Sequence, residues 1–129
     1  MSQTRIFRGV ETKIFHHDHD SIVLPDGTGS PTEQWTLGSY RDTVVVKWSR
    51  RYLVLNSGGW RSATTKLRMN QAANQFSLGY QVYQENFDWY VYYNTLFLKP
   101  LDASSVAKDT VVENSARVDF HDNLIFQRI

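Results

Sequence analysis

The segment at 43–76, TVVVKWSRRYLVLNSGGWRSATTKLRMNQAANQF, decides the fold class. It begins with two β-branched and apolar runs, Thr43–Trp48 and Tyr52–Leu55, which only the residues 49–51 separate. Runs of this kind joined by so short a connection predict an antiparallel β-hairpin. The NSGG sequence at 56–59 then ends the second strand, because glycine reaches the positive φ angles that tight turns require.

One principal helix, at about 65–76, is predicted after this turn. Thr64 and Thr65 provide hydroxyl groups that can cap its first turn, and Leu78-Gly79 provides a glycine that can end it. Apolar residues recur at the helical period and define a buried stripe with a polar arc on the opposite side. The stripe is Met69, Ala72, Ala73 and Phe76, and the polar arc is Arg68, Asn70, Gln71, Asn74 and Gln75.

The rest of the chain is dominated by the period-2 alternation that is typical of half-buried strands. We expect the segments after the helix to form a meander of neighbouring strands that ends in a hairpin around Asp122 and Asn123. The predicted strands outside the central segment are 13–17, 21–24, 34–40, 80–84, 89–93, 96–98, 117–120 and 124–126.

Two further segments complete the predicted organisation. The PDGTGSP sequence at 25–31 is dense in turn-forming residues and predicts a loop. The segment 104–112 fits either a short helix or a loop. We therefore expect one domain over residues 1–129 with an α+β fold, in which an antiparallel sheet or partial barrel packs against one principal helix.

The composition restricts the possible classes of protein. The chain has 129 residues, of which 41% are hydrophobic and 21% charged, near the average for globular domains. The absence of cysteine excludes disulfides, a thiol nucleophile and cysteine-based zinc sites. No apolar run approaches the roughly 20 residues of a membrane helix, and the N-terminal sequence lacks the pattern of a signal peptide. We therefore expect a protein that neither crosses a membrane nor is exported.

Charge is distributed unevenly along the chain, although the formal net charge is only +1. Residues 41–68 contain seven basic residues and one acidic residue, Asp42, whereas both flanking regions are net acidic. A local positive potential attracts a polyanion even when the total charge is small. The central segment is therefore the candidate for contact with an anionic partner.

The segment 41–71 predicts a nucleic-acid interface. The glycine pair can let backbone N–H groups approach an anion at the start of the helix, basic side chains can bind phosphate, and an exposed tryptophan can stack on a base. The alternative is an ordinary strand-to-helix turn with Trp60 in the core and the basic residues on a solvated face. The candidate residues for nucleic-acid binding are Arg50, Arg51, Trp60, Arg61, Lys66, Arg68, Asn70 and Gln71.

The hairpin predicted at 80–93 supports a different function. Alternation places Tyr90 and Tyr92 on one face of the second strand and Trp89 and Tyr93 on the other, so that one aromatic set is core and the other is accessible. Exposed aromatic residues are typical of protein interfaces. The alternative is therefore an inhibitor or adaptor that binds a host protein or a small nucleotide. A homo-oligomer that covers the second face is also compatible with this pattern.

The HHDHD sequence at 16–20 has some features of a metal site. His17 and His19 share one face of a strand, and His121 is available as a third ligand. The other interpretation is a polar strand end whose Asp side chains cap backbone donors. Because the sequence does not define three ligand positions, we expect no metal and no cofactor. No acid–base or nucleophile arrangement is recognisable either, so we expect a protein without enzymatic activity.

The sequence LNSGGWRSATTKLRMNQ at 55–71 resembles the signature of a family of small proteins from tailed-phage genomes. The sequence NQFSLGY at 74–80 and the downstream Trp89 also resemble that family. Because the family has no assigned activity, the resemblance implies a phage protein in the host cytoplasm and no particular mechanism.

The resemblance is looser upstream and extends over roughly residues 13–100. The sequence VLPDG at 23–27 and the strand at 43–46 fit the family less closely. The sequence departs from its relatives at 49–51, where they tend to have a turn of the Asn-Gly type. The two arginines make this hairpin tip more basic than in those relatives.

Overall fold

The central segment folds into the hairpin that its sequence predicts. β3 (Thr43–Trp48) pairs antiparallel with β4 (Tyr52–Leu55), and Trp48 lies opposite Leu53. The computed structural model describes residues 12–101, 106–112 and 114–129, and for 16–19 and 106–112 it describes the backbone. Within these ranges the hairpin is the centre of a larger sheet.

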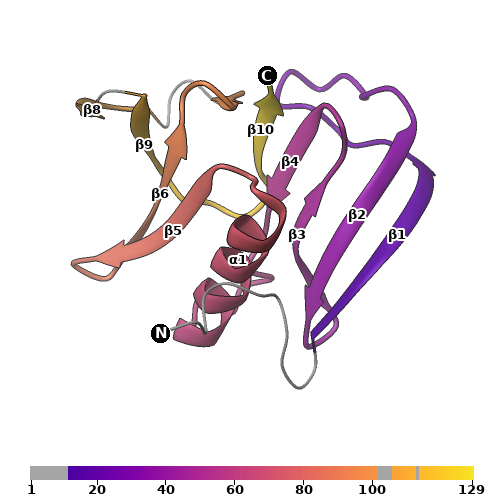
Figure 1. Cartoon of the computed structure of the whole chain (residues 1–129), viewed down its shortest axis with the longest axis horizontal. Coiled ribbons are helices and arrows are strands. Elements are labelled where there is room, and N and C mark those ends of the chain that lie inside the picture. The colour runs from indigo at the N-terminus through magenta and orange to yellow at the C-terminus, as the bar shows by residue number, and fades with distance from the viewer. Residues whose placement is uncertain (1–11, 102–105, 113) are drawn as a thin grey trace.

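The strands of the described chain form two antiparallel sheets. The remaining strands are β1 (Thr12–Asp20), β2 (Glu33–Tyr40), β5 (Tyr80–Glu85), β6 (Asp88–Asn94), β7 (Leu98–Pro100), β8 (Val106–Val112), β9 (Ser115–Asp119) and β10 (Leu124–Arg128). The larger sheet has the order β1-β2-β3-β4-β10-β7 and the smaller has β5-β6-β9-β8 (Figure 1). With one helix in the described residues, this confirms the predicted α+β class, and the sheets do not close into a barrel.

The helix α1 (Ala63–Phe76) begins two residues earlier than predicted. Its N-cap is Ser62, whose hydroxyl accepts a hydrogen bond from the Thr65 backbone N–H at 3.2 Å. The helix ends at Ser77, which adopts a left-handed conformation with φ of 54°, so the predicted role of Gly79 as the terminating residue is wrong. No helix in the described ranges has the length and apolar character that a membrane crossing requires.

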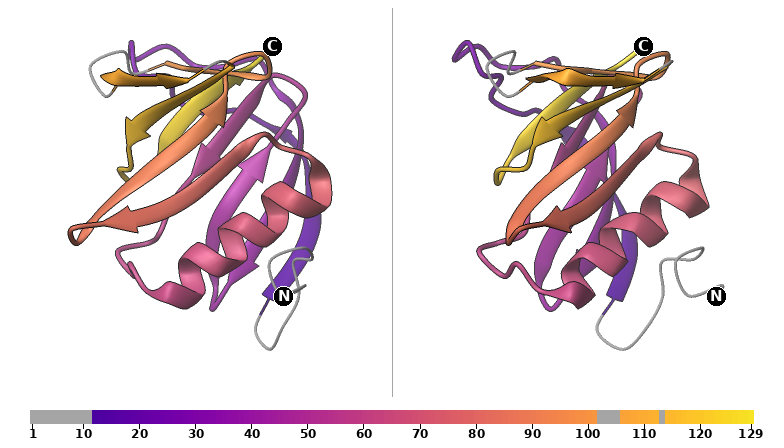
Figure 2. Two further views of the ribbon diagram at one scale, coloured as in Figure 1. Left: turned by 60° about the vertical axis from the view of Figure 1, so that its left-hand side comes forward. Right: turned by 90° about the vertical axis from the view of Figure 1, so that its left-hand side faces the viewer.

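The predicted apolar stripe of α1 is confirmed. Met69 and Ala72 are inaccessible to solvent, Ala73 is buried, and the half-buried Phe76 packs against Trp48 with ring centroids 4.8 Å apart. The helix lies beside β5 and across one face of the larger sheet (Figure 2). The stripe therefore faces the hydrophobic core between the two sheets.

The predicted polar arc is wrong at two positions because α1 has neighbours on two sides. Gln71 is buried and accepts a hydrogen bond from the Arg68 guanidinium at 3.0 Å. The Asn70 amide accepts from the Val82 backbone N–H at 2.7 Å and donates to the Val82 carbonyl at 2.8 Å. Through these two bonds the Asn70 side chain pairs with both backbone groups of Val82, as a neighbouring strand would, and so joins α1 to β5.

The described residues form two hydrophobic clusters, of which the main one holds the two sheets together. The main cluster lies between the sheets and α1, and it includes Val46, Leu55, Val91 and Phe126, none of which is exposed to solvent. The second lies on the opposite face of the larger sheet, where the loop after β1 packs over its members. These are Ile22, Trp35, Val54 and Ile125.

The alternation predicted for 89–93 is confirmed, since Trp89, Val91 and Tyr93 are buried while Tyr90 is half-buried and Tyr92 is exposed. The predicted strand at 21–24 is reduced to one bridge between Val23 and Gly29. In contrast, β1 extends to Asp20, beyond the predicted end of the first strand.

The predicted hairpin of 80–84 with 89–93 is confirmed, since β5 pairs antiparallel with β6. The continuation of the meander into 96–98 and the terminal hairpin are wrong, because β7 pairs with β10 and because β9 and β10 lie in different sheets. β9 pairs with β6 in the smaller sheet, whereas β10 lies between β4 and β7 in the larger one. The segment at 120–123 therefore crosses from one sheet to the other (Figure 2). The segment 106–112, predicted as helix or loop, is the strand β8.

We predict that Asn70→Ala lowers the free energy of unfolding by about 1–3 kcal/mol, since it leaves both backbone groups of the buried Val82 without their partner. Chemical denaturation followed by circular dichroism measures this loss. Gln81→Ala, which removes an exposed amide from the same strand, is the control and is expected to change stability by less than about 0.5 kcal/mol. Equal effects of the two substitutions would contradict this role for Asn70.

Candidate nucleic-acid interface

The NSGG turn between β4 and α1 forms its hydrogen bonds within the chain. The Ser57 backbone N–H and hydroxyl both donate to Oδ1 of Asp122, at 2.9 and 2.6 Å. The Gly58 N–H donates to the Asn56 side chain and the Gly59 N–H to the Ser57 hydroxyl, at 3.1 and 3.2 Å. The expected cradle for an external anion is therefore not present at the glycine pair, because these donors already have partners.

Close packing explains the first glycine of the pair. Gly58 has a φ of +64°, and a Cβ atom there would lie 2.7 Å from the Thr43 methyl group. A residue with a Cβ atom here would require the Thr43 side chain to shift. The turn therefore brings the chain after β4 back to the beginning of β3.

Asp122 remains ionised in this position. Partial burial by itself raises its pKa, but the hydrogen bonds from Ser57 and the positive charge of Arg61 outweigh this effect. The pKa of Asp122 therefore lies below its usual range. No sequence pattern indicates this role, since 65 residues separate Ser57 from Asp122.

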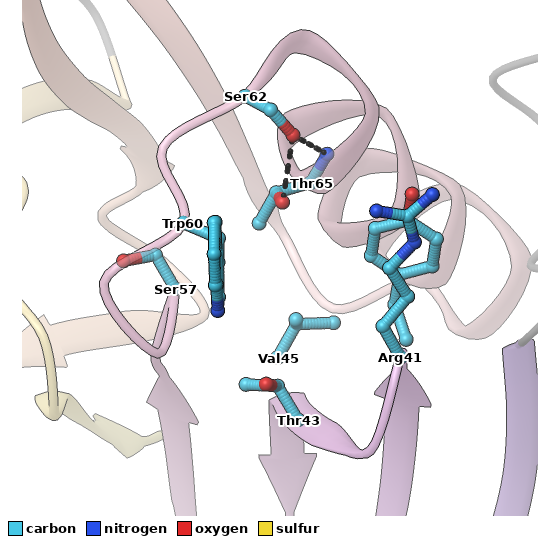
Figure 3. Close-up of a pocket in the computed structure, with 8 residues that line it drawn as sticks. Arg41, Thr43, Val45, Ser57, Trp60, Ser62 and Thr65 are labelled. Carbon is cyan, nitrogen blue, oxygen red and sulfur yellow. Dashed lines mark hydrogen bonds between the residues drawn. The ribbon is translucent and has the colours of Figure 1, made fainter.

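Trp60 lies on the surface, with 74% of its area exposed, so its interpretation as a core residue is wrong. It lines a pocket of about 240 Å³ between the β2–β3 turn, the NSGG turn and the first turn of α1. Trp60 and Arg41 stand on opposite sides of this pocket, with Thr43 and Val45 between them (Figure 3). The other lining residues are Tyr40, Ser57, Ser62 and Thr65.

Near this pocket, four cationic side chains of the described residues each lie over an aromatic ring. The Arg41 and Arg68 guanidinium groups are 5.5 and 5.8 Å from the centre of the Tyr40 ring. Arg61 lies 5.2 Å from the ring of Phe120, and Lys66 lies 5.6 Å from that of Trp89. We call Trp60 and these four cations the basic rim.

The structure separates Arg50 and Arg51 from the basic rim. They occupy the β3–β4 turn, at the opposite end of β3 from the pocket, and the length of that strand places them roughly 17 Å away. Their neighbourhood is the C-terminus, where the Arg128 backbone N–H donates to the Arg51 carbonyl at 2.7 Å. The predicted candidates therefore form three groups: those of the basic rim, the pair Arg50 and Arg51, and the Asn70 and Gln71 amides, whose hydrogen bonds lie within the fold.

Arg41 and Tyr40 are site residues that the sequence analysis did not identify. Both residues at the tip of the β2–β3 turn, Arg41 and Asp42, have positive φ angles of 51° and 63°. This tight turn points Arg41 toward α1 rather than away from it (Figure 3). Arg41 was included in the basic segment, but a charge count alone could not place it opposite Trp60.

The expectation that the protein binds no metal stays a prediction. The side chains of His17 and His19 fall outside the part of the chain whose side chains are described. Nδ1 of His121 lies 3.0 Å from the Asp122 carbonyl oxygen. Among the described residues, no group of three possible ligands comes together.

Comparison with known proteins identifies one family. The model of the family described as Kyanoviridae Gp96 protein matches residues 39–108, just over half of the chain. This range contains β3, β4, α1 and every residue of the basic rim. No curated protein and no solved structure gives a significant match.

We predict that Asp122→Asn lowers the free energy of unfolding by about 1–2 kcal/mol at neutral pH, because an amide is a weaker acceptor for the Ser57 donors. A carboxyl whose pKa is lowered by folding stabilises the protein fully above the ordinary Asp pKa of about 3.9, and this contribution is lost as the pH falls through the folded-state value. The variant is therefore expected to lose less stability than the wild type across this acidic range.

Denaturant titrations at a series of pH values measure this difference. Asp119→Asn, at an exposed position on β9, is the control and should follow the wild-type pH profile. An Asp122→Asn profile parallel to that of the wild type would show that the carboxylate does not hold the turn.

Proposed function

The chain belongs to the Kyanoviridae Gp96 protein family, and on this premise we propose that it is a non-enzymatic phage protein that binds single-stranded nucleic acid in the host cytoplasm. The observation that carries the proposal is the exposure of Trp60, which is 74% accessible and lines a pocket opposite the Arg41 side chain. A large exposed aromatic ring among cations is the usual composition of a surface that binds single strands.

The pocket suits a single unstacked base. Its walls are the Trp60 ring on one side and the Arg41 side chain on the other, and the apolar Val45 lies between them. Indole and guanidinium planes both stack on nucleobases, and every base has a face for such stacking. A base inside a duplex has both faces covered by its neighbours. We therefore propose a single-stranded ligand.

The basic rim is placed to bind the phosphates that flank this base. Arg41 and Arg68 lie on the Tyr40 side of the first turn of α1, while Arg61 and Lys66 lie on the side of the smaller sheet. The first turn of α1 contains no acidic residue. Since the N-terminus of a helix is already positive, cations near it are unfavourable until an anion binds.

The alternative of a protein partner is supported by the outer face of the smaller sheet. The Tyr83 and Tyr92 rings stack with centroids 4.7 Å apart, and the Arg117 guanidinium lies 4.5 Å from the centre of the Tyr90 ring. Arg117 also forms an ion pair with Glu85 at 3.5 Å. An aromatic protein interface responds much less to salt than phosphate binding does, so ionic strength distinguishes the two functions.

We predict that a short fluorescent single-stranded oligonucleotide binds the protein at about 50 mM salt with a micromolar or lower Kd, as fluorescence anisotropy can measure. Trp60→Ala should weaken binding by about 1–3 kcal/mol because the base no longer has the indole ring to stack on. Because Trp60 is exposed, its removal should leave the melting temperature nearly unchanged. No binding by folded wild-type protein would reject the proposal in favour of a protein partner.

We further predict that each of Arg41→Ala, Arg61→Ala and Lys66→Ala reduces the salt dependence of binding. The slope of log K against log salt should fall by about 0.7 for each phosphate of the single strand that the variant no longer binds. The double variant Arg50→Ala/Arg51→Ala removes two positive charges from the opposite end of β3 and is the matched control, with an unchanged slope expected.

A mononucleotide tests whether the pocket alone is sufficient. If phosphates on both sides of the base contribute, a mononucleotide should bind far more weakly than an oligonucleotide. Equal affinity for the two ligands would instead indicate a small-nucleotide site.

A further inference from the structure

The tip of the β5–β6 hairpin exposes an aromatic ring in a conformation that favours glycine. Asn86 and Phe87 form a two-residue turn with φ angles of 51° and 69°. Such turns prefer Asn-Gly, because a bulky side chain is strained at positive φ. The Phe87 residue is nevertheless 93% exposed, so the ring has almost no contact within its own chain that compensates for the strain. Backbone strain that no contact within the chain compensates indicates that the Phe87 ring serves a function other than stabilising this fold.

The hairpin tip and the pocket lie at the same end of the molecule. The Lys66 ammonium group is 3.3 Å from Oε1 of Gln84, which places the hairpin beside the first turn of α1. Ser62 and Thr65, on that same turn, line the pocket. Figures 1 and 2 show the tip of the β5–β6 hairpin projecting beyond the smaller sheet at the end where α1 begins.

The two features are complementary in shape and in charge. The pocket holds about 240 Å³ and presents the apolar surfaces of Val45, Tyr40 and Trp60. Phe87 is a flat apolar ring, and the exposed carboxylates Glu85 and Asp88 flank it on either side of the turn. Glu85 also pairs with Arg117 of its own chain at 3.5 Å. Of the basic rim, Arg41 lines the pocket and Arg68 lies over Tyr40, another lining residue. Arg61 and Lys66 lie on the side of the smaller sheet, over Phe120 and Trp89. A ring with two flanking acids therefore matches an apolar pocket that has cations beside it.

We propose that Phe87 of a second copy of this chain occupies the pocket. Because the ring and the pocket lie at one end of the molecule, a two-fold axis lets each copy insert its Phe87 into the other. The contact places Glu85 and Asp88 of one copy near the cations of the other. A self-associated pair has its pockets filled, so self-association competes with ligand binding. This competition rests on the proposed nucleic-acid function, whereas the self-association itself does not.

Sedimentation velocity over a wide range of protein concentration tests the contact. The wild type should form dimers as concentration rises, and Phe87→Gly should remain monomeric over the same range. Glycine suits the turn, so this variant should melt at the same temperature as the wild type or higher. Phe87→Asn, which also tolerates positive φ, serves as a second variant if the first does not fold. A wild type that stays monomeric, or a dimer that survives both substitutions, would overturn the proposal.

The same variants separate this proposal from the nucleic-acid function. A single-stranded oligonucleotide should dissociate wild-type dimers, and Phe87→Gly should bind that oligonucleotide at least as tightly as the wild type. Dimers that bind the oligonucleotide without dissociating would refute the shared pocket. If dimers depend on Phe87 and no oligonucleotide binds, the nucleic-acid function is rejected and the pocket is a site for self-association alone.

Discussion

The contact between Asp122 and Ser57 is the constraint on which the arrangement of the two sheets depends. The chain leaves the larger sheet at the NSGG turn to enter α1, returns to it for the short strand β7, and makes its last return at 120–123, after β9 of the smaller sheet. The first departure and the last return meet at one carboxylate, which accepts hydrogen bonds from the backbone and the side chain of Ser57. The same turn positions Trp60 and Ser62, so the pocket depends on this contact as well.

Local patterns predicted the elements of this fold better than they predicted the partners of those elements. The β3–β4 hairpin, the stripe of α1 and the alternation at 89–93 depend on neighbours that are close in sequence, and the sequence defined them correctly. The position of β10 between β4 and β7 depends on segments that are distant in sequence. Alternation shows that a segment is a strand with one buried face, but it does not show which strand edge lies beside it.

For the candidate site too, the sequence predicts which residue types are present but not where the fold places them. The sequence indicated correctly that the central segment concentrates positive charge, but a charge count treats Arg41, Arg50 and Arg61 alike. The hairpin places Arg41 and Arg61 at one end of β3 and Arg50 at the other. Gln71 was misplaced for a related reason: a helical wheel assumes one buried side, whereas α1 packs against both a sheet face and the strand β5.

The two proposed occupants of the pocket share the same physical description. A nucleotide within a single strand is a flat ring with a phosphate on either side. The tip of the β5–β6 hairpin is a flat ring, Phe87, with the carboxylates of Glu85 and Asp88 on either side. On these proposals, an apolar pocket with cations beside it suits both occupants, because aromatic and guanidinium planes stack on many kinds of ring and cations bind either kind of anion. The proposed contact would also explain the strain at Phe87, since a glycine at that position would relax the turn but remove the ring that fills the pocket.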